Sequence, residues 1–245
     1  MHRGVVIGVV ASVVAFAAAA AAGSPFATLS VSPNKAGKGS KATLDITPPK
    51  ADQNPRSITL RVVKGVKFDP RAVAVKCTKQ QADGNKCPSA SRIGGGTTNA
   101  TVSSTSNPPL FSPMGVSVQV DLFLAPPQKS GDRAGVVAHF KVSQTGQQGH
   151  VIGRVTAIDV GPYGLQTRFD NLDTVLRPPA GTKAHVDHVH LVYGVHRTVK
   201  KNGKTVRYDL IKNPKQCGGS WPYQLTLGYR TSGPVTYKGS IACTQ

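Results

Sequence analysis

The amino-acid sequence predicts an all-β fold, an antiparallel β-sandwich or jelly-roll-like double sheet. Apolar and polar residues alternate along much of the chain, which is the period of a half-buried strand. The chain contains 26 Gly and 18 Pro, which suit many short strands joined by tight turns. All 11 acidic residues are Asp and none is Glu. Because Glu favours helix interiors and Asp favours caps and turns, a helical bundle is a poor fit.

Each strand is predicted from a local run of alternating residues. In the run 116–124, the residues Val116, Val118, Val120, Leu122 and Leu124 share one face. The predicted strands cover residues 28–32, 41–47, 57–64, 116–124, 136–143, 150–160, 165–169, 185–193, 205–211, 223–229 and 235–243.

Turn chemistry separates these strands. Asn202-Gly203 lies between two alternating runs and predicts a hairpin with a type I′ turn. Gly94-Gly95-Gly96 is interpreted as a turn or bulge, since no Lys-Ser/Thr follows to make a phosphate loop. The Ser/Thr/Asn/Pro-rich residues 97–113 predict either a linker between two sandwiches or a long loop within one. A division into residues 24–105 and 110–245 is therefore left open.

Residues 1–22 have the features of a secretory signal peptide. A short basic segment with Arg3 precedes an apolar run, and Ala20-Ala21-Ala22 supplies the small residues that a signal peptidase needs. The alternative is a retained membrane helix, because the run is just long enough to span a bilayer. Cleavage would leave residues 23–245 as a β-sandwich region with no further spanning segment. We therefore expect a secreted protein, either extracellular or associated with the cell wall.

The four cysteines fit such a compartment. Three pairings are possible, and the spacing favours two local disulfides, Cys77–Cys87 and Cys217–Cys243. The loop-entropy model assigns them roughly 3 and 3.5 kcal/mol of stabilisation. Neither pair is a CxxC motif, and a metal site would need four thiolates from distant segments.

Two parts of the chain resemble known proteins. Residues 64–77 read KGVKFDPRAVAVKC and residues 86–100 read KCPSASRIGGGTTNA. Near the C-terminus, residues 210–229 read LIKNPKQCGGSWPYQLTLGY and residues 237–243 read YKGSIAC. The pattern resembles a group of secreted actinobacterial β-sandwich proteins of uncharacterised function, with a CPxxSxIG turn and a C-terminal NPxxCxG-W segment. The resemblance implies the sandwich fold, secretion, and structural roles for the motifs; it carries no catalytic residues across.

The histidines are the first candidates for chemistry. His188 and His190 are two residues apart, so a strand projects both from one face. Two such imidazoles can bind zinc or copper if a third ligand joins them, and His139 or His150 is the expected third. The alternative is that the imidazoles line the polar face of a half-exposed strand. No GxSxG elbow is present, and no catalytic residue is predicted.

Charge is the most unusual property of the chain. Its 30 Lys and Arg against 11 Asp give a formal charge of +19. The predicted hairpin at 202–203 concentrates this charge, and such a field attracts polyanions. The predicted polyanion-binding residues are Arg197, Lys200, Lys201, Lys204 and Arg207. No recognition helix accompanies them, so specific nucleic-acid binding is not indicated. The alternative is a charge that serves solubility alone.

Taken together, the sequence favours a non-enzymatic protein of the cell envelope that binds anionic wall polymers or polysaccharide through the basic hairpin. The alternative is a metal-binding protein or metal-dependent enzyme that uses His188 and His190. A third hypothesis is a structural module that contacts a protein partner through a sheet edge. Only the metal alternative implies a cofactor.

Overall fold

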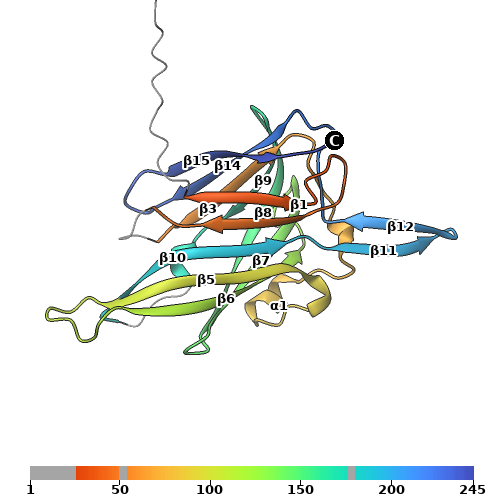
Figure 1. Cartoon of the computed structure of the whole chain (residues 1–245). Helices are drawn as coiled ribbons and strands as arrows, with labels where there is room; N and C mark the ends of the chain where they lie inside the picture. The colour runs from red at the N-terminus through yellow and green to blue at the C-terminus, as the bar shows by residue number, and fades with distance from the viewer. Residues whose placement is uncertain (1–25, 50–53, 176–179) are drawn as a thin grey trace, which may run out of the picture.

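The computed structural model describes residues 26–49, 54–175 and 180–245. The predicted signal segment, residues 1–22, lies outside the described residues. The all-β prediction is confirmed, since strands make up most of the regular structure (Figure 1). The strands are β1 (Ala27–Ser32), β2 (Lys41–Ile46), β3 (Ser57–Val63), β4 (Lys67–Phe68), β5 (Arg92–Ser104), β6 (Met114–Ala125), β7 (Asp132–Val142), β8 (Gln148–Val160), β9 (Tyr163–Phe169), β10 (Thr182–Tyr193), β11 (His196–Lys201), β12 (Lys204–Asp209), β13 (Ile211–Lys212), β14 (Ser220–Gly228) and β15 (Val235–Ala242). The helical elements are the short helix α1 (Lys79–Asp83) and three 3-10 turns, Pro70–Ala72, Ser89–Ser91 and Leu172–Thr174.

Eleven strands form one antiparallel sheet in the order β1-β2-β10-β5-β6-β7-β8-β9-β3-β14-β15. The sheet curls so that its two edge strands, β1 and β15, lie alongside each other (Figure 1). Beyond these strands, the Ala36 N–H donates to the Thr244 carbonyl at 2.8 Å. Between them, the buried Tyr223 hydroxyl accepts from the Leu29 N–H at 3.2 Å and donates to the Ala27 carbonyl at 3.3 Å. The curled sheet thus becomes two facing layers around one interior.

Strands from both halves of the chain are interleaved in this sheet. β5 lies between β10 and β6, and β3 lies between β9 and β14. Residues 24–105 and 110–245 therefore do not form separate sheets. Residues 97–104, expected to begin a linker or loop, belong to β5, and only residues 105–113 form a connection.

The Gly-rich start of β5 explains why its strand character was not predicted. Three consecutive glycines have low strand propensity, yet here they let β10 approach closely. A Cβ atom at Gly94 would overlap the Val192 carbonyl, and one at Gly96 would overlap the His190 carbonyl. The pairing with β6 also shifts register between Arg92 and Gly94, so the expected bulge is present within a strand.

The interior face follows the predicted alternation. On β6, the side chains of Val118, Leu122 and Leu124 are buried at 4 %, 5 % and 0 % exposure. On β14, Trp221 and Leu225 are buried in the same way, and the Trp221 Nε1–H donates to the carbonyl of Gln216 at 3.0 Å. Trp221 therefore belongs to the core.

Both predicted disulfides are present. Cys77–Cys87 closes the loop that carries α1, and Cys217–Cys243 ties the segment before β14 to the end of β15. The α1 loop covers the outer face of the sheet, where Ala82 packs with Phe123 and Val137 in a small second core. Among the described residues, no helix has the length and apolar character needed to cross a membrane.

One buried side chain holds the connection between β1 and β2. Asn213 is 3 % exposed, and its Nδ2 donates to the carbonyls of Pro33 and Lys35, each at 2.9 Å. Its Oδ1 accepts from the Ser40 hydroxyl at 2.8 Å, and its backbone N–H donates to the Lys38 carbonyl at 2.9 Å. The Asn of the NPxxC motif therefore has a structural role in this fold, because this one buried side chain bonds to three residues of the connection between β1 and β2.

Candidate functional site: an apolar cavity inside the curled sheet

The interior of the sheet is not filled along its whole length. A cavity of about 480 Å³ lies between the facing layers, within the size range of small-molecule sites. Its walls come from β2, β3, β5, β6, β7, β8, β9, β10 and β14. The curl of the sheet therefore brings together side chains that are distant in sequence.

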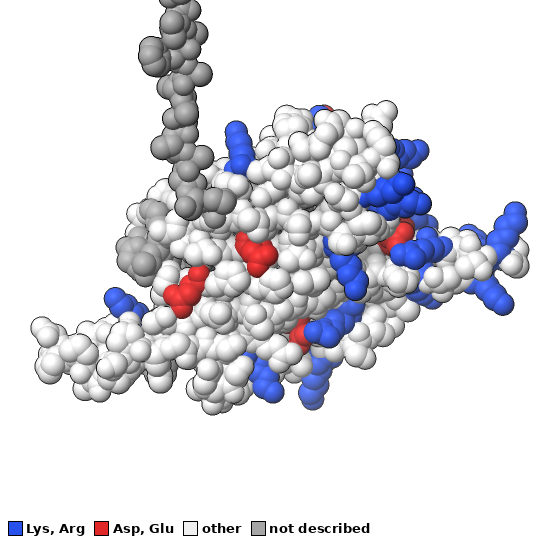
Figure 2. Space-filling view, viewed as in Figure 1, with Lys and Arg blue, Asp and Glu red and all other residues white. Residues whose placement is uncertain are grey.

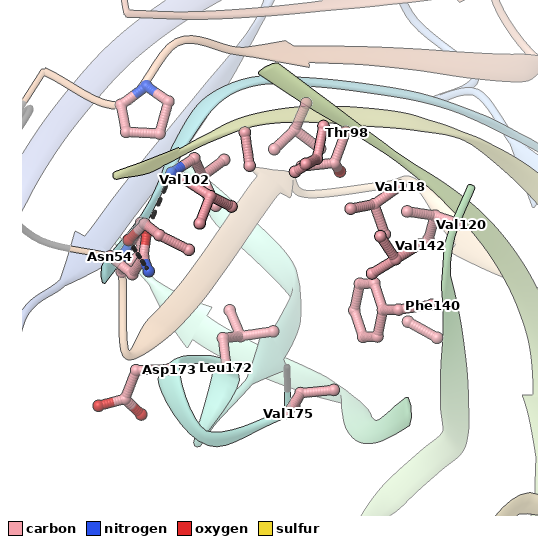
Figure 3. Close-up of a pocket in the computed structure, with 18 of the residues that line it drawn as sticks. Asn54, Thr98, Val102, Val118, Val120, Phe140, Val142, Leu172, Asp173 and Val175 are labelled. Carbon is pink, nitrogen blue, oxygen red and sulfur yellow. Dashed lines mark hydrogen bonds between the residues drawn. The ribbon is translucent and has the colours of Figure 1, made fainter. Parts of the chain in front are cut away.

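Aliphatic and aromatic side chains dominate the cavity wall. Figure 3 shows Val118, Phe140 and Val142 on one side of open space, facing Val102 and Leu172 on the other. Such a lining offers a ligand few hydrogen bonds and a large apolar contact area. The apolar residues of the wall are Ile46, Ile58, Ala100, Val102, Phe111, Met114, Val116, Val118, Val120, Leu122, Ala138, Phe140, Val142, Val151, Phe169, Leu172, Val175, Ala184, Val186, Val189, Leu191 and Leu227, with Pro48 and Pro55.

Two polar side chains of the wall, Asn54 and Asp173, form hydrogen bonds with other parts of the protein. Asn54 donates to the Ala184 carbonyl at 2.8 Å and accepts from the Val186 N–H at 2.9 Å. It replaces the pairing that β2 would provide, because β2 ends opposite Val189. The Asp173 carboxylate accepts from Arg230 at 2.7 Å and, in Figure 3, points away from the apolar side chains.

The cavity opens at one end of the molecule. Its rim includes the exposed turn residues Gln144 and Thr145 between β7 and β8, and the exposed Met114 at the start of β6. At the opposite end the interior is packed by side chains with no exposure, among them Leu124 and Leu210. The inward-facing side chains of β6 therefore extend from the open rim, near Met114, to the closed end, near Leu124.

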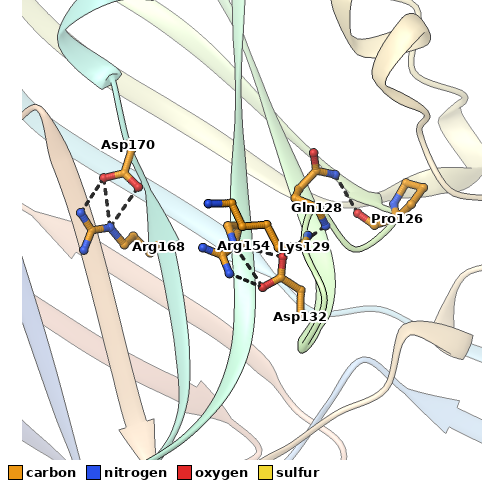
Figure 4. Close-up of polar contacts among 7 residues, drawn as sticks. All are labelled: Pro126, Gln128, Lys129, Asp132, Arg154, Arg168 and Asp170. Carbon is orange, nitrogen blue, oxygen red and sulfur yellow. Dashed lines mark hydrogen bonds and ion pairs between the residues drawn. The ribbon is translucent and has the colours of Figure 1, made fainter.

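Most carboxylates near the sheet surface are paired with arginine. Asp132 accepts from Arg154 Nη2 at 2.7 Å and from the Lys129 N–H at 2.8 Å, while Asp170 accepts from Arg168 at 2.8 Å (Figure 4). The hydrogen bond from Arg154 is the main reason that the pKa of Asp132 lies below its usual value. The Asp132–Arg154 pair links β7 to β8, the Arg168–Asp170 pair lies at the end of β9, and neither pair belongs to the cavity wall.

The structure places His188 and His190 on one face of β10, as predicted. Both face Asp45 of β2: His190 Nδ1 lies 2.6 Å and His188 Nε2 lies 3.6 Å from the Asp45 carboxylate. The expected third ligands, His139 and His150, are not brought to them, since β5 and β6 separate β10 from β7. Within the described ranges, no group of three or more His, Cys, Asp or Glu side chains could hold a metal ion.

His139 and His150 instead form a separate pair on the outer face of β7 and β8, with ring centroids 6.0 Å apart. His139 Nε2 lies 3.6 Å from the Cys87 sulfur, and His150 lies 3.2 Å from the Asp83 carboxylate at the end of α1. Burial, and secondarily the neighbouring His150, lowers the pKa of His139. This pair anchors the α1 loop to the sheet.

The basic hairpin has the predicted form. β11 and β12 pair with Lys201 opposite Lys204, and both Asn202 and Gly203 have positive φ, as a type I′ turn requires. The hairpin projects from the closed end of the molecule, and Lys and Arg are concentrated near it (Figures 1 and 2). All five predicted polyanion-binding side chains are exposed, namely Arg197, Lys200, Lys201, Lys204 and Arg207.

The cavity was not among the sites predicted from the sequence. The sequence does contain one indication of the cavity. Residues 93–120, which supply much of the wall, contain no charged residue in a chain with a formal charge of +19. The shape of the cavity depends on strand order, which alternation does not give. In comparisons of this chain with models of protein families, with curated proteins and with solved structures, no match was found.

Proposed function

We propose that this protein binds an elongated apolar ligand, such as the acyl chain of a lipid, inside the curled sheet. The observation that supports it most directly is the cavity of about 480 Å³ with a predominantly apolar wall and exposed residues at its rim. An apolar chain that enters this space leaves water and contacts aliphatic side chains on all sides. Both effects favour binding without hydrogen bonds from the wall.

The proposal is tested with residues 23–245, which contain every described residue of the fold. We expect a fluorescent fatty acid to bind in aqueous buffer and to be displaced by saturated fatty acids. The affinity should rise with chain length, by up to about fourfold per methylene, until the cavity is filled. A long-chain alcohol should compete nearly as well as the acid, because the wall recognises the chain. An affinity that does not depend on chain length would contradict the proposal.

The projecting basic hairpin supports a second function, binding to an anionic polymer of the cell envelope. Five exposed basic side chains lie on two short strands, where Asp209, paired with Arg207 at 2.8 Å, is the only acidic residue. The two disulfides suit an oxidising compartment outside the cytoplasm. A signal segment at residues 1–22, and the resemblance to secreted actinobacterial β-sandwich proteins, support the same location.

Replacing Lys200, Lys201 and Lys204 together with Gln should weaken co-sedimentation with isolated cell-wall material. The effect should be clear at low salt and small at high salt, because counterion release makes such binding steeply salt-dependent. The matched control replaces the exposed Lys76, Lys86 and Lys129 with Gln, which removes the same charge elsewhere. Equal loss in both triple variants would show that only net charge matters, and the hairpin would have no special role.

A further inference from the structure

The connection between β5 and β6 extends beyond the rim of the cavity and carries no charge. Residues 93–120 contain no Asp, Lys, Arg or His, although the whole chain carries 30 Lys and Arg. In Figure 2 the protrusion at the left of the molecule, formed by this hairpin, has neither blue nor red surface along its outer part. The basic hairpin projects from the other end.

Apolar side chains are exposed at the tip of this uncharged hairpin. Leu110 is 79 % exposed and Met114 is 52 % exposed, and Phe111 is partly buried beside them. Among the described residues, four large hydrophobic side chains are exposed, and Leu110 and Met114 are two of them. Contact with water is unfavourable for both side chains, so moving the tip from water into an apolar environment lowers the free energy.

The tip has a defined form rather than a merely extended chain. The Ser104 hydroxyl accepts from the N–H groups of Ser106 and Leu110, each at 3.2 Å. At the base, the Thr105 N–H donates to the Gly181 carbonyl at 2.9 Å. The turn therefore satisfies part of its own backbone, which lowers the cost of moving it into an apolar environment.

The tip and the cavity are continuous. Phe111 and Met114 belong both to the tip and to the wall of the cavity, together with Val102 and Val116 just below them. Two exposed lysines flank the base of the hairpin: Lys183 is paired with Ser103 on β5, and Lys141 is paired with Gln119 on β6. Their positions suit the headgroups of anionic lipids, since basic groups near a negative membrane surface are attracted to it.

We propose that the tip of this hairpin, residues 104–114, inserts into a lipid surface and places the rim of the cavity against it. The inference rests on the proposed function, because it gives an acyl chain a route from the surface into the cavity without crossing water. A lipid surface fits better than a protein partner, because the tip combines apolar side chains with uncharged Ser, Thr and Asn. It offers no charged group that would orient a protein.

The test is flotation of residues 23–245 with vesicles of phosphatidylcholine, with and without phosphatidylglycerol. The variant carries Leu110→Asp, at the tip but outside the wall of the cavity. The matched control carries Val160→Asp, which places the same charge on an apolar side chain that is 47 % exposed, at the end of β8. Binding of a fluorescent fatty acid in solution, without vesicles, is measured on all three proteins.

We expect the Leu110→Asp protein to bind vesicles about tenfold more weakly or worse, since an apolar contact with the lipid is lost and a charge takes its place. The Val160→Asp protein should bind as the unchanged chain does, and fatty-acid binding should stay within about twofold in all three. Unchanged vesicle binding by the Leu110→Asp protein, or no vesicle binding by the unchanged chain, would overturn the inference. Binding that the Leu110→Asp protein retains but high salt abolishes would assign the lipid contact to basic residues instead. Fatty-acid binding without vesicle binding would leave the proposed function standing, and absence of both would overturn both.

Discussion

The substitution Val118→Trp is expected to weaken the binding of a fatty acid by at least about tenfold while the sheet remains folded. Val118 lines the middle of the cavity wall, paired with Thr98 of β5 and Val142 of β7, which also line it. An indole at this position fills space that an acyl chain would occupy. The chain then loses contact for several methylenes, each worth about 0.8 kcal/mol. The measurement is displacement of a fluorescent fatty acid, with thermal unfolding as the check on the fold.

The control for this experiment is on the next residue of the same strand. Gln119 is exposed on the outer face of β6, so Gln119→Trp adds the same side chain outside the cavity. It should leave the affinity unchanged. If Val118→Trp proves too unstable to study, Ala100→Leu fills the same cavity from β5 with less bulk. Full affinity in a folded cavity-filling variant would show that the ligand binds elsewhere.

The substitution Asn213→Ala should have the largest effect on stability, with a loss of roughly 3 to 4 kcal/mol. It removes the hydrogen bonds to the Ser40 hydroxyl, which is buried, and to the carbonyls of Pro33 and Lys35, which are partly buried. A hydrogen bond contributes about 1 kcal/mol, and a buried group left without a partner costs about 1 to 3 kcal/mol. Urea unfolding at equilibrium would measure the change as a lower midpoint with a similar slope.

Asn34→Ala is the matched control for Asn213→Ala. Asn34 also donates an amide hydrogen bond, to the Ala242 carbonyl at 3.1 Å, but in an exposed position. Because water can replace this partner, the loss should stay below about 1 kcal/mol. If the two variants lost the same stability, the burial of Asn213 would not be the reason for its effect.

The sequence was informative where a local pattern decides the structure. Alternation located most strands, Asn202-Gly203 located the hairpin, and the short spacings within each cysteine pair identified both disulfides. It was misleading at β5, where Gly94-Gly95-Gly96 and the following Ser, Thr and Asn residues resemble a loop. Only the close approach of β10 shows why glycines belong in that strand.

The cavity could not be predicted in the same way. Alternation shows that Val118 and Val120 point inward, but not whether opposing side chains fill the space between them. That depends on which strands face each other, and here small side chains such as Ala100 and Ala138 contribute to the shortfall in volume. The prediction of a third metal ligand was wrong for the same reason. The order of strands in the sheet separates His139 and His150 from His188.

The order of strands also has a consequence for how the chain folds. β10 is inserted between β2 and β5, and the last strands join the first across the gap bridged by Tyr223. Most pairings of the early strands therefore wait for segments that are synthesised much later. Folding that depends on such distant pairings is slow, with times from milliseconds to seconds. The meander from β5 to β9 pairs through local contacts, but β2 and β3 complete their pairing only when β10 and β14 are available, so the closed sheet forms late in folding.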